Sequence, residues 1–317
     1  MIRSALISLA LASPAGAFEL AFPVDCTLGE TCFIQQTADH DPGPGPGAQD
    51  FTCGPLSYDG HDGTDIALPD RAAMQAGVAV LAAAPGTVVA LRDGLADAAP
   101  FPSGQDCGNG LILRHEGGWQ TQYCHLREGS LAVHLGQRVE TGATLGLIGQ
   151  SGNAEFPHLH LTLRRDTGWT DPFAPGAATC GGEATGLWQP PLPLAPGGIA
   201  SAGITSEIPG FDAIKAGLPT GTLPATAPAV VLWVQIFGAR AGDAILITLT
   251  GPQGDLLTER VPLDRTQARL FRAVGKRLTA PAWPPGPYHG TARLMRGAAE
   301  IDRITVQTAL DPAPAAP

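Results

Sequence analysis

Polar and apolar residues alternate strictly along HLHLTLRR, residues 158–165. This alternation predicts a strand whose leucines face a core, while His158, His160, Thr162 and Arg164 share the opposite face. Short apolar segments separated by Gly, Asp and Pro precede it, at 77–83, 86–94, 109–118, 119–126 and 143–152. Because tight turns between short strands join antiparallel neighbours, we expect a mainly β domain with an antiparallel sheet over residues 56–180.

A second group of strand-like segments lies at 229–238, 243–251, 268–275, 288–297 and 302–310. Their spacing predicts a C-terminal β-sandwich over residues 229–310. Residues 283–297 resemble the final hairpin of Ig-like sandwich domains, which implies an Ig-like fold. Within that hairpin, Trp283 and Tyr288 are either core residues or exposed aromatics that could stack on sugar.

The remaining segments have the composition of turns, linkers and termini. Residues 18–55 contain DPGPGPG, which cannot hold a helix or a central strand, and we expect a turn-rich N-terminal segment there. Residues 181–228 are rich in Gly, Pro, Ala and Thr and predict a linker. The last residues, 311–317, read DPAPAAP and predict a disordered tail.

The chain begins with the layout of a cleavable signal peptide, predicted over residues 1–17. Arg3 precedes an apolar run from Ala5 to Ala12, and Ala15-Gly16-Ala17 supplies the small residues of a cleavage site. No stretch reaches the ~20 apolar residues that a membrane span needs. We therefore expect a secreted or periplasmic protein without a membrane span.

Composition and charge narrow the possible partners. The chain has 41 glycines and 30 prolines but only 15% charged residues, which again favours short strands joined by turns. The formal net charge is −10 and no Lys/Arg cluster is present, so nothing would neutralise a phosphate backbone. Nucleic acid is therefore not an expected partner.

All six cysteines follow the predicted signal peptide. An even number in an exported chain predicts three disulfides, which allow 15 pairings. Proximity favours Cys26–Cys32 and Cys107–Cys124, which leaves Cys53–Cys180 to tie together the two ends of one domain. The alternative is a thiolate metal site, but the chain has no C-x-x-C pair.

Five residues of the 56–180 segment could form a metal site. Side chains two apart on a strand stand roughly 6 to 7 Å apart at the backbone, so both imidazoles of His158 and His160 can reach one small site. His61 and Asp65 are joined by a Gly-containing turn, and His125 ends an apolar-polar strand. Catalytic zinc takes three N/O ligands plus an open position for water, whose pKa it lowers. His61, Asp65 and one of the paired histidines would supply that set, although a lone His-x-His is more often two exposed polar residues.

The ordered segments HDGTDIAL, TQYCHLREGS and GQRVETGATLGLIGQSGNAEFPHLHLTLR resemble the lysostaphin/LytM-type zinc metallopeptidases. These enzymes, of the duplicated hybrid motif fold, cut peptide bonds in bacterial peptidoglycan. The resemblance implies that His61, Asp65 and His160 bind one Zn²⁺ per chain, and that His125 and His158 are catalytic. It also implies a zinc metalloendopeptidase that hydrolyses peptidoglycan cross-links by a metal-activated water.

Two alternatives and several departures accompany this resemblance. The protein could be a non-catalytic wall-associated module that activates another hydrolase, or an exported protease acting on proteins. Phe156 replaces the glycine usual before Pro-His-Leu-His, and Glu155 replaces a small or hydroxyl residue, so we expect these side chains to narrow or charge the substrate groove. Residues 93–108 form a longer segment than the usual hairpin, and we expect a surface loop pinned by Cys107–Cys124.

We expect surface or structural roles for the other histidines, His40, His115, His134 and His289.

Overall fold

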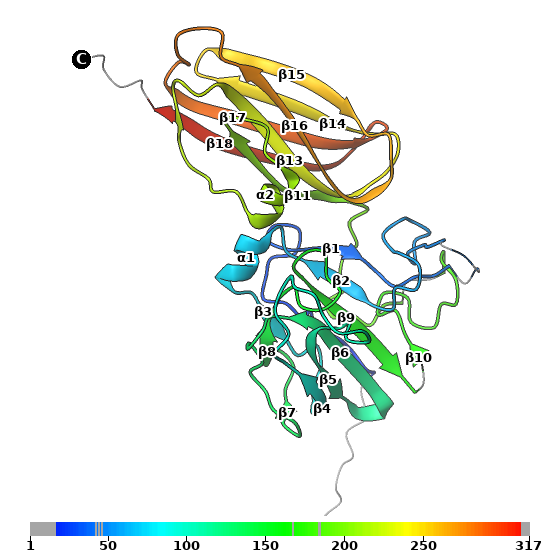
Figure 1. Cartoon of the computed structure of the whole chain (residues 1–317). Helices are drawn as coiled ribbons and strands as arrows, with labels where there is room; N and C mark the ends of the chain where they lie inside the picture. Colours follow the sequence, from blue (N-terminus) through cyan, green and yellow to red (C-terminus); the bar gives the residue numbers. More distant parts are fainter. Residues whose placement is uncertain are drawn as a thin grey trace, which may run out of the picture.

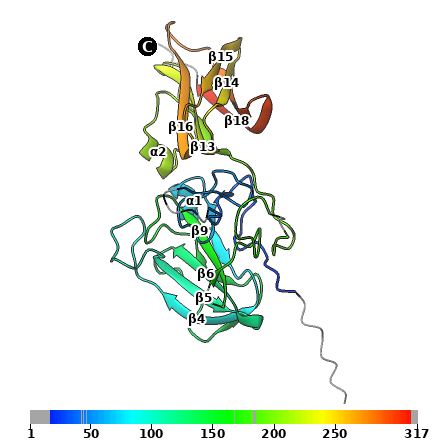
Figure 2. The same cartoon turned by 90° about the vertical axis from the view of Figure 1, so that its right-hand side faces the viewer.

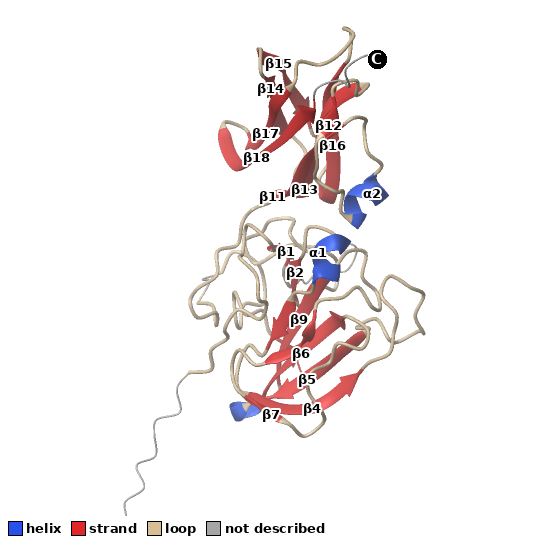
Figure 3. Cartoon of the chain, turned by 90° about the vertical axis from the view of Figure 1, so that its left-hand side faces the viewer, coloured by secondary structure: helices blue, strands red, loops and turns tan. Residues whose placement is uncertain are grey.

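The computed structural model describes residues 17–41, 43, 45, 47–166, 168–182 and 185–311. The predicted signal peptide therefore lies outside the described residues except for Ala17, and the predicted tail lies outside them except for Asp311. The structure is mainly β, and its helices are short (Figure 3). No helix among the described residues is long and apolar enough to cross a membrane.

An N-terminal β domain contains strands β1 to β10. Its largest sheet is antiparallel and eight-stranded, in the order β1-β2-β9-β6-β5-β4-β7, with β10 pairing with β9 (Figure 1). The bounds of its strands are β1 Phe33–Gln36, β2 Thr64–Ala67, β4 Gly86–Arg92, β5 Asn109–Arg114, β6 Trp119–Leu126, β7 Arg138–Val139, β9 His158–Arg165 and β10 Gly168–Trp169. A two-stranded sheet pairs β3 (Ala79–Leu81) with β8 (Thr144–Leu147). The helices of this domain are α1 (Arg71–Ala76) and the 3₁₀ turn η1 (Glu116–Gly118).

The alternation in β9 has the predicted result on its core face. Leu159, Leu161 and Leu163 are fully buried and pack in one cluster with Ile66 of β2 and Tyr123 of β6. The opposite face of β9 is also largely shielded from solvent, since His158 and Thr162 are buried and His160 is partly buried. Polar side chains on that face are therefore held in a mostly desolvated environment.

All three predicted disulfides are confirmed, and all lie in the N-terminal β domain. Cys26 pairs with Cys32, Cys53 with Cys180, and Cys107 with Cys124. No cysteine is free, so the thiolate metal site is wrong. Residues 93–108 precede β5 as the predicted loop, which the Cys107–Cys124 bond fastens to β6.

A C-terminal sandwich contains β11 to β18. Its three-stranded sheet has the order β11-β13-β16, and its five-stranded sheet has the order β12-β18-β17-β14-β15. Apolar residues of both sheets, such as Leu232 of β13 and Ile247 of β14, form one buried cluster. The bounds are β11 Gly198–Thr205, β12 Leu223–Pro224, β13 Ala229–Ala239, β14 Asp243–Gly251, β15 Gly254–Pro262, β16 Gln267–Arg277, β17 Gly286–Arg296 and β18 Ala299–Asp311. The two packed sheets are a sandwich, and its Ig-like character stays a prediction.

One feature of this sandwich differs from the sequence analysis, and another decides between two alternatives left open there. The segment predicted as a linker, 181–228, contains β11, which pairs with β13 along most of its length. Gly, Ala and Ser dominate β11, so no apolar alternation marks it as a strand. Trp283 and Tyr288 are 6% and 0% exposed and belong to the core, so they are not exposed platforms for sugar.

The two β-rich units are in contact around α1 and α2 (Phe211–Ala216), as both side views show (Figures 1 and 2). Gly217 ends α2 with φ 95°, and a Cβ there would lie 2.5 Å from the Cβ of Ala72 in α1. Next to the helices, the Phe33 and Phe237 rings stack with centroids 4.3 Å apart. A direct apolar contact thus joins β1 of the first domain to β13 of the second.

Candidate metal centre and active site

Three adjacent strands bring the predicted site residues together. In the register of β2 with β9, Asp65 lies opposite His160 and Ala67 lies opposite His158. On the other side of β9, His160 lies opposite Cys124 of β6, the residue before His125. His61 precedes β2 in a tight turn, where its backbone N–H donates to the Tyr58 carbonyl. The site is therefore built on the middle of the sheet, on strands rather than on long loops.

His61, Asp65 and His160 converge on one point. The distance from His61 Nε2 to Asp65 Oδ1 is 3.2 Å, that from His61 Nε2 to His160 Nδ1 is 3.2 Å, and that from His160 Nδ1 to Asp65 Oδ1 is 2.9 Å. Tetrahedral zinc ligands at ordinary bond lengths lie about 3.3 Å from one another. The three donor atoms thus have the chemistry and nearly the spacing of a zinc site, and they are a group that could hold a metal ion.

The outer nitrogens of the two imidazoles are held by other groups. His61 Nδ1 lies 2.7 Å from the Thr37 carbonyl, to which it donates, so Nε2 presents its lone pair to the centre. His160 Nε2 lies 3.2 Å from Asp62 Oδ1 and 2.9 Å from Thr162 Oγ1. Such outer contacts fix the ring orientation and raise the basicity of a metal-binding imidazole.

Asp62 links His160 to a surface cation. Its second carboxylate oxygen accepts a hydrogen bond from Arg164 Nη2 at 3.0 Å. Burial alone would raise the pKa of Asp62, but the hydrogen bond with His160 and the nearby positive charges lower it to about 2. Asp62 is therefore ionised throughout the physiological range, and it can hold the His160 N–H by a charge-assisted hydrogen bond.

His125 and His158 lie together beside this group, with ring centroids 4.5 Å apart. His125 Nδ1 donates to the Ser151 carbonyl at 2.8 Å, and His158 Nδ1 donates to the Phe156 carbonyl at 2.9 Å. Each ring is thereby left with Nε2 as its acceptor atom. His158 Nε2 lies 3.6 Å from Asp65 Oδ1, which places it at the edge of the candidate metal centre.

A local distortion of β6 directs His125 into the site. The pairing of β5 with β6 shifts in register before Leu126, and His125 has φ 63°, a conformation that few residues other than glycine adopt. Bulges of this kind redirect a side chain next to active sites. The His125 backbone N–H donates to the Cys107 carbonyl at 2.8 Å, so the disulfide-bonded loop holds the distorted segment.

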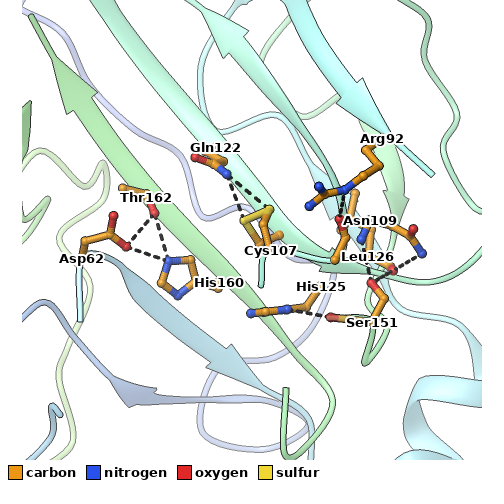
Figure 4. Close-up of a disulfide and its surroundings, with 12 residues drawn as sticks. Asp62, Arg92, Cys107, Asn109, Gln122, His125, Leu126, Ser151, His160 and Thr162 are labelled. Atoms are coloured by element: carbon orange, nitrogen blue, oxygen red, sulfur yellow. Dashed lines mark hydrogen bonds and ion pairs between the residues drawn. A yellow bond between two sulfur atoms is a disulfide. The ribbon is translucent and has the colours of Figure 1, made fainter. Parts of the chain in front are cut away.

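Ser151, whose carbonyl holds the His125 ring, is itself fixed by hydrogen bonds near the Cys107–Cys124 disulfide (Figure 4). Ser151, whose carbonyl accepts from His125, donates its hydroxyl to the Leu126 carbonyl at 2.7 Å. The Ser151 hydroxyl also accepts from the Asn109 backbone N–H at 2.9 Å. His125 is therefore held at its backbone by Cys107 and at its ring by Ser151.

The pKa shifts of four site residues, His125, His158, His160 and Asp65, fall into two groups. Burial lowers the pKa of His158, and burial with the charges of His158 and His160 lowers that of His125 well below 6.5. Burial alone would also lower the pKa of His160, but its contacts with Asp62 and Asp65 raise it to about 9. The surrounding histidines keep the pKa of Asp65 well below 3.8, against the effect of burial. The imidazoles of His125 and His158 are thus neutral, and they lie beside the charged side chains of His160 and Asp65.

The structure brings all five predicted residues together and places the other histidines elsewhere. His40 is buried and pairs with Asp171 at 2.8 Å, and His115 is buried between the Pro85 carbonyl and Thr121. His134 and His289 are exposed. Sequence reasoning did not find the supporting groups Thr37, Asp62, Asn109, Ser151 and Thr162. The sequence pointed only to two of them: Asp62 directly follows His61, and Thr162 lies on the same face of β9 as His158 and His160.

The family assignment rests on the segment that holds this site. Peptidase family M23 matches residues 59–172. These residues form a peptidase M23 domain. The match confirms the resemblance found in the sequence motifs, because it includes His61, Asp65, His125, His158 and His160.

Relatives of the M23 domain cover only part of this chain. Peptidoglycan DD-endopeptidase ShyA of Vibrio cholerae is 33% identical over 103 residues, which are 32% of this chain and 20% of that protein. Cell division protein DipM of Caulobacter vibrioides is 39% identical over 57 residues, 18% of this chain and 9% of that protein. The chain thus aligns with about a fifth or less of the length of these two relatives.

Solved structures of similar proteins also cover about half of the chain or less. A variant of the catalytic domain of the prophage-encoded M23 protein EnpA of Enterococcus faecalis is 22% identical, covering 49% of this chain and 93% of that one, with a TM-score of 0.32. The catalytic domain of lysostaphin from Staphylococcus simulans is 23% identical, covering 41% of this chain and 86% of that one, with a TM-score of 0.28.

Proposed function

We propose that this protein is a zinc metalloendopeptidase that hydrolyses peptide cross-links of bacterial peptidoglycan. The observation that carries the proposal is the convergence of His61, Asp65 and His160 beside two neutral imidazoles. The M23 domain and its similarity to a peptidoglycan DD-endopeptidase support the substrate class. Three disulfides support a secreted or periplasmic location, since such bonds persist in oxidising compartments.

One zinc ion would be held by His61 Nε2, the Asp65 carboxylate and His160 Nδ1. When bound, zinc lowers the pKa of water and polarises a substrate carbonyl. The residues fit this ion because their donor atoms lie at nearly tetrahedral ligand separations and their outer nitrogens are held by Thr37, Asp62 and Thr162. Three protein ligands leave one position open for water or substrate.

His125 and His158 would move the proton and stabilise the charge of the reaction. Their low pKa values leave both imidazoles neutral at neutral pH, so either Nε2 can accept a proton from the attacking water. The imidazolium that results can donate its Nε2–H to the leaving amine, and the second ring could support the developing oxyanion only as an imidazolium that carries a proton on Nε2. The backbone carbonyls at Ser151 and Phe156 hold both rings in the tautomer whose Nε2 can accept a proton.

The test is zinc content and hydrolysis measured on the same protein samples. Purified protein with intact disulfides is assayed for metal and incubated with purified sacculi, alongside the His160→Ala, His125→Ala and exposed-site His134→Ala variants. We expect about one zinc ion per chain and release of cleaved muropeptides from wild type and His134→Ala. His160→Ala should lose both zinc and release, whereas His125→Ala should lose release but keep zinc.

The other outcomes separate the alternative functions. Stoichiometric zinc without muropeptide release would contradict the hydrolase and favour a non-catalytic module that acts through another enzyme. Cleavage of an unfolded protein but not of sacculi would favour an exported protease. Loss of zinc in His125→Ala would move His125 from the catalytic pair to the ligand set.

A further inference from the structure

A groove of about 930 Å³ leads from the candidate metal centre to the C-terminal sandwich. Asp65 and His158 line it on the side of the M23 domain. Its opposite side is formed by Phe211 and Lys215 of α2 and by Gln267 and Arg269 of β16. A peptide bound at the metal centre would therefore meet side chains of both domains, although every residue of the candidate centre comes from the first.

Arg269 of β16 in the C-terminal sandwich contacts residues of the M23 domain. Its Nη2 donates to the carbonyl of Leu68 at 2.9 Å, one residue beyond β2, and lies 3.4 Å from that of Pro69. Its guanidinium carbon lies 4.8 Å from the Phe156 ring centroid and 5.3 Å from that of Phe33. Burial among these groups lowers the pKa of Arg269 to about 10, but the side chain remains a cation at neutral pH.

The contact with Phe156 continues to His158. The Phe156 and His158 rings lie 4.6 Å apart, and the Phe156 carbonyl accepts the hydrogen bond that fixes the His158 ring. Leu68 is tied to the same segment, because its N–H donates to the Pro157 carbonyl at 3.0 Å. Arg269 thus contacts both backbone segments that flank His158, one by hydrogen bonding and one by cation–π stacking.

We propose that Arg269 is a positioning residue for His158, so that the C-terminal sandwich completes the active site of the M23 domain. This inference rests on the proposed peptidase function. Arg269 holds the ring and carbonyl of Phe156 in place, and the Phe156 carbonyl fixes the His158 imidazole that faces the candidate metal centre. Phe156, which replaces a small residue of the family pattern, is then the adaptor through which the second domain acts.

The test compares Arg269→Met and Arg269→Lys with Arg277→Met, a control at an exposed position of the same strand. Each full-length protein is assayed on a purified cross-linked muropeptide, with rates divided by zinc-loaded protein. We expect Arg269→Met to lower kcat by about tenfold or more with little change in KM, as for a small displacement of a catalytic group. Arg269→Lys, which keeps the cation, should recover part of kcat, and Arg277→Met should match wild type.

A second measurement follows the His158 ring itself. Protein labelled with ¹⁵N-histidine is examined by NMR with and without zinc, and His158→Gln identifies the resonance. We expect Arg269→Met to shift the His158 ring signals, because the neighbouring Phe156 ring moves, while Arg277→Met leaves them unchanged.

The outcomes distinguish this inference from the proposed function. An active wild type whose kcat and His158 signals are unaffected by Arg269→Met would overturn the positioning role alone. A loss of thermal stability or zinc content with unchanged kcat per zinc-loaded molecule would assign Arg269 a purely structural role. An inactive wild type would overturn the peptidase and, with it, the catalytic meaning of Arg269; the NMR shifts would then still report whether Arg269 holds the ring.

Discussion

Removal of the Cys107–Cys124 disulfide should affect both stability and catalysis. The bond closes a loop with a sequence separation of 17 residues, which corresponds to about 3 kcal/mol of unfolding free energy through the entropy of the unfolded chain. The same loop holds the His125 backbone through the Cys107 carbonyl. In the Cys107→Ala/Cys124→Ala protein we therefore expect that loss of stability together with a lower kcat. Zinc content should be retained, because the proposed ligands belong to β2, β9 and the turn before β2.

The other two disulfides provide matched comparisons for the assay. Sequence separations of 6 and 127 residues correspond to about 2 kcal/mol for Cys26–Cys32 and about 5 kcal/mol for Cys53–Cys180. Calorimetry of the three double-alanine proteins under oxidising conditions should rank them in that order, with Cys107–Cys124 between. An unchanged stability without Cys107–Cys124, or a greater loss than without Cys53–Cys180, would refute the loop-entropy reasoning. Unchanged kcat would refute the role of the loop in holding His125.

Three further changes have defined outcomes. Asp62→Asn removes the charge that holds His160, so zinc affinity in a chelator competition should fall roughly 10- to 100-fold; wild-type affinity would count against this contact. Tyr123→Phe removes the hydroxyl that accepts from the Ala83 N–H, which should cost about 1–3 kcal/mol in denaturant unfolding; no loss would mean that the N–H finds another acceptor. Burial lowers the pKa of His115 below 6.5, so its stabilising effect is present above pH 6.5 and is lost as the pH falls through the folded-state pKa. His115→Gln should therefore lose less unfolding free energy on acidification than wild type, and equal losses would exclude His115 as a source of acid sensitivity.

Two kinds of feature could be predicted from the sequence: strands in which polar and apolar residues alternate, and the disulfide bonds. Residues 119–126 are β6 as predicted, and the histidine face of β9 follows from its leucines. β15 escaped prediction because it is an exposed edge strand with charged residues, and β11 because its small side chains carry no pattern. The polar support of the site depends on tertiary contacts: Thr37 reaches His61 across 24 residues and Arg269 reaches Leu68 across 201. No local pattern encodes such distances.

The position of β9 inside the eight-stranded sheet has a consequence for motion. β9 lies between β2 and β6, so the backbone at His160 is paired on both sides, whereas His158 is paired with β2. The amide hydrogens around His160 should therefore exchange only when the sheet opens. The far side of the groove belongs to a separate hydrophobic core, and only a small apolar cluster around Phe33 and Phe237 joins the two, so we expect its displacement to cost less free energy than opening the sheet. Movement of the sandwich relative to the M23 domain would therefore change the width of the groove. The separation of the metal-binding atoms would stay constant. Hydrogen exchange should accordingly be slowest at the strands that carry the chemistry and faster at the junction with α2.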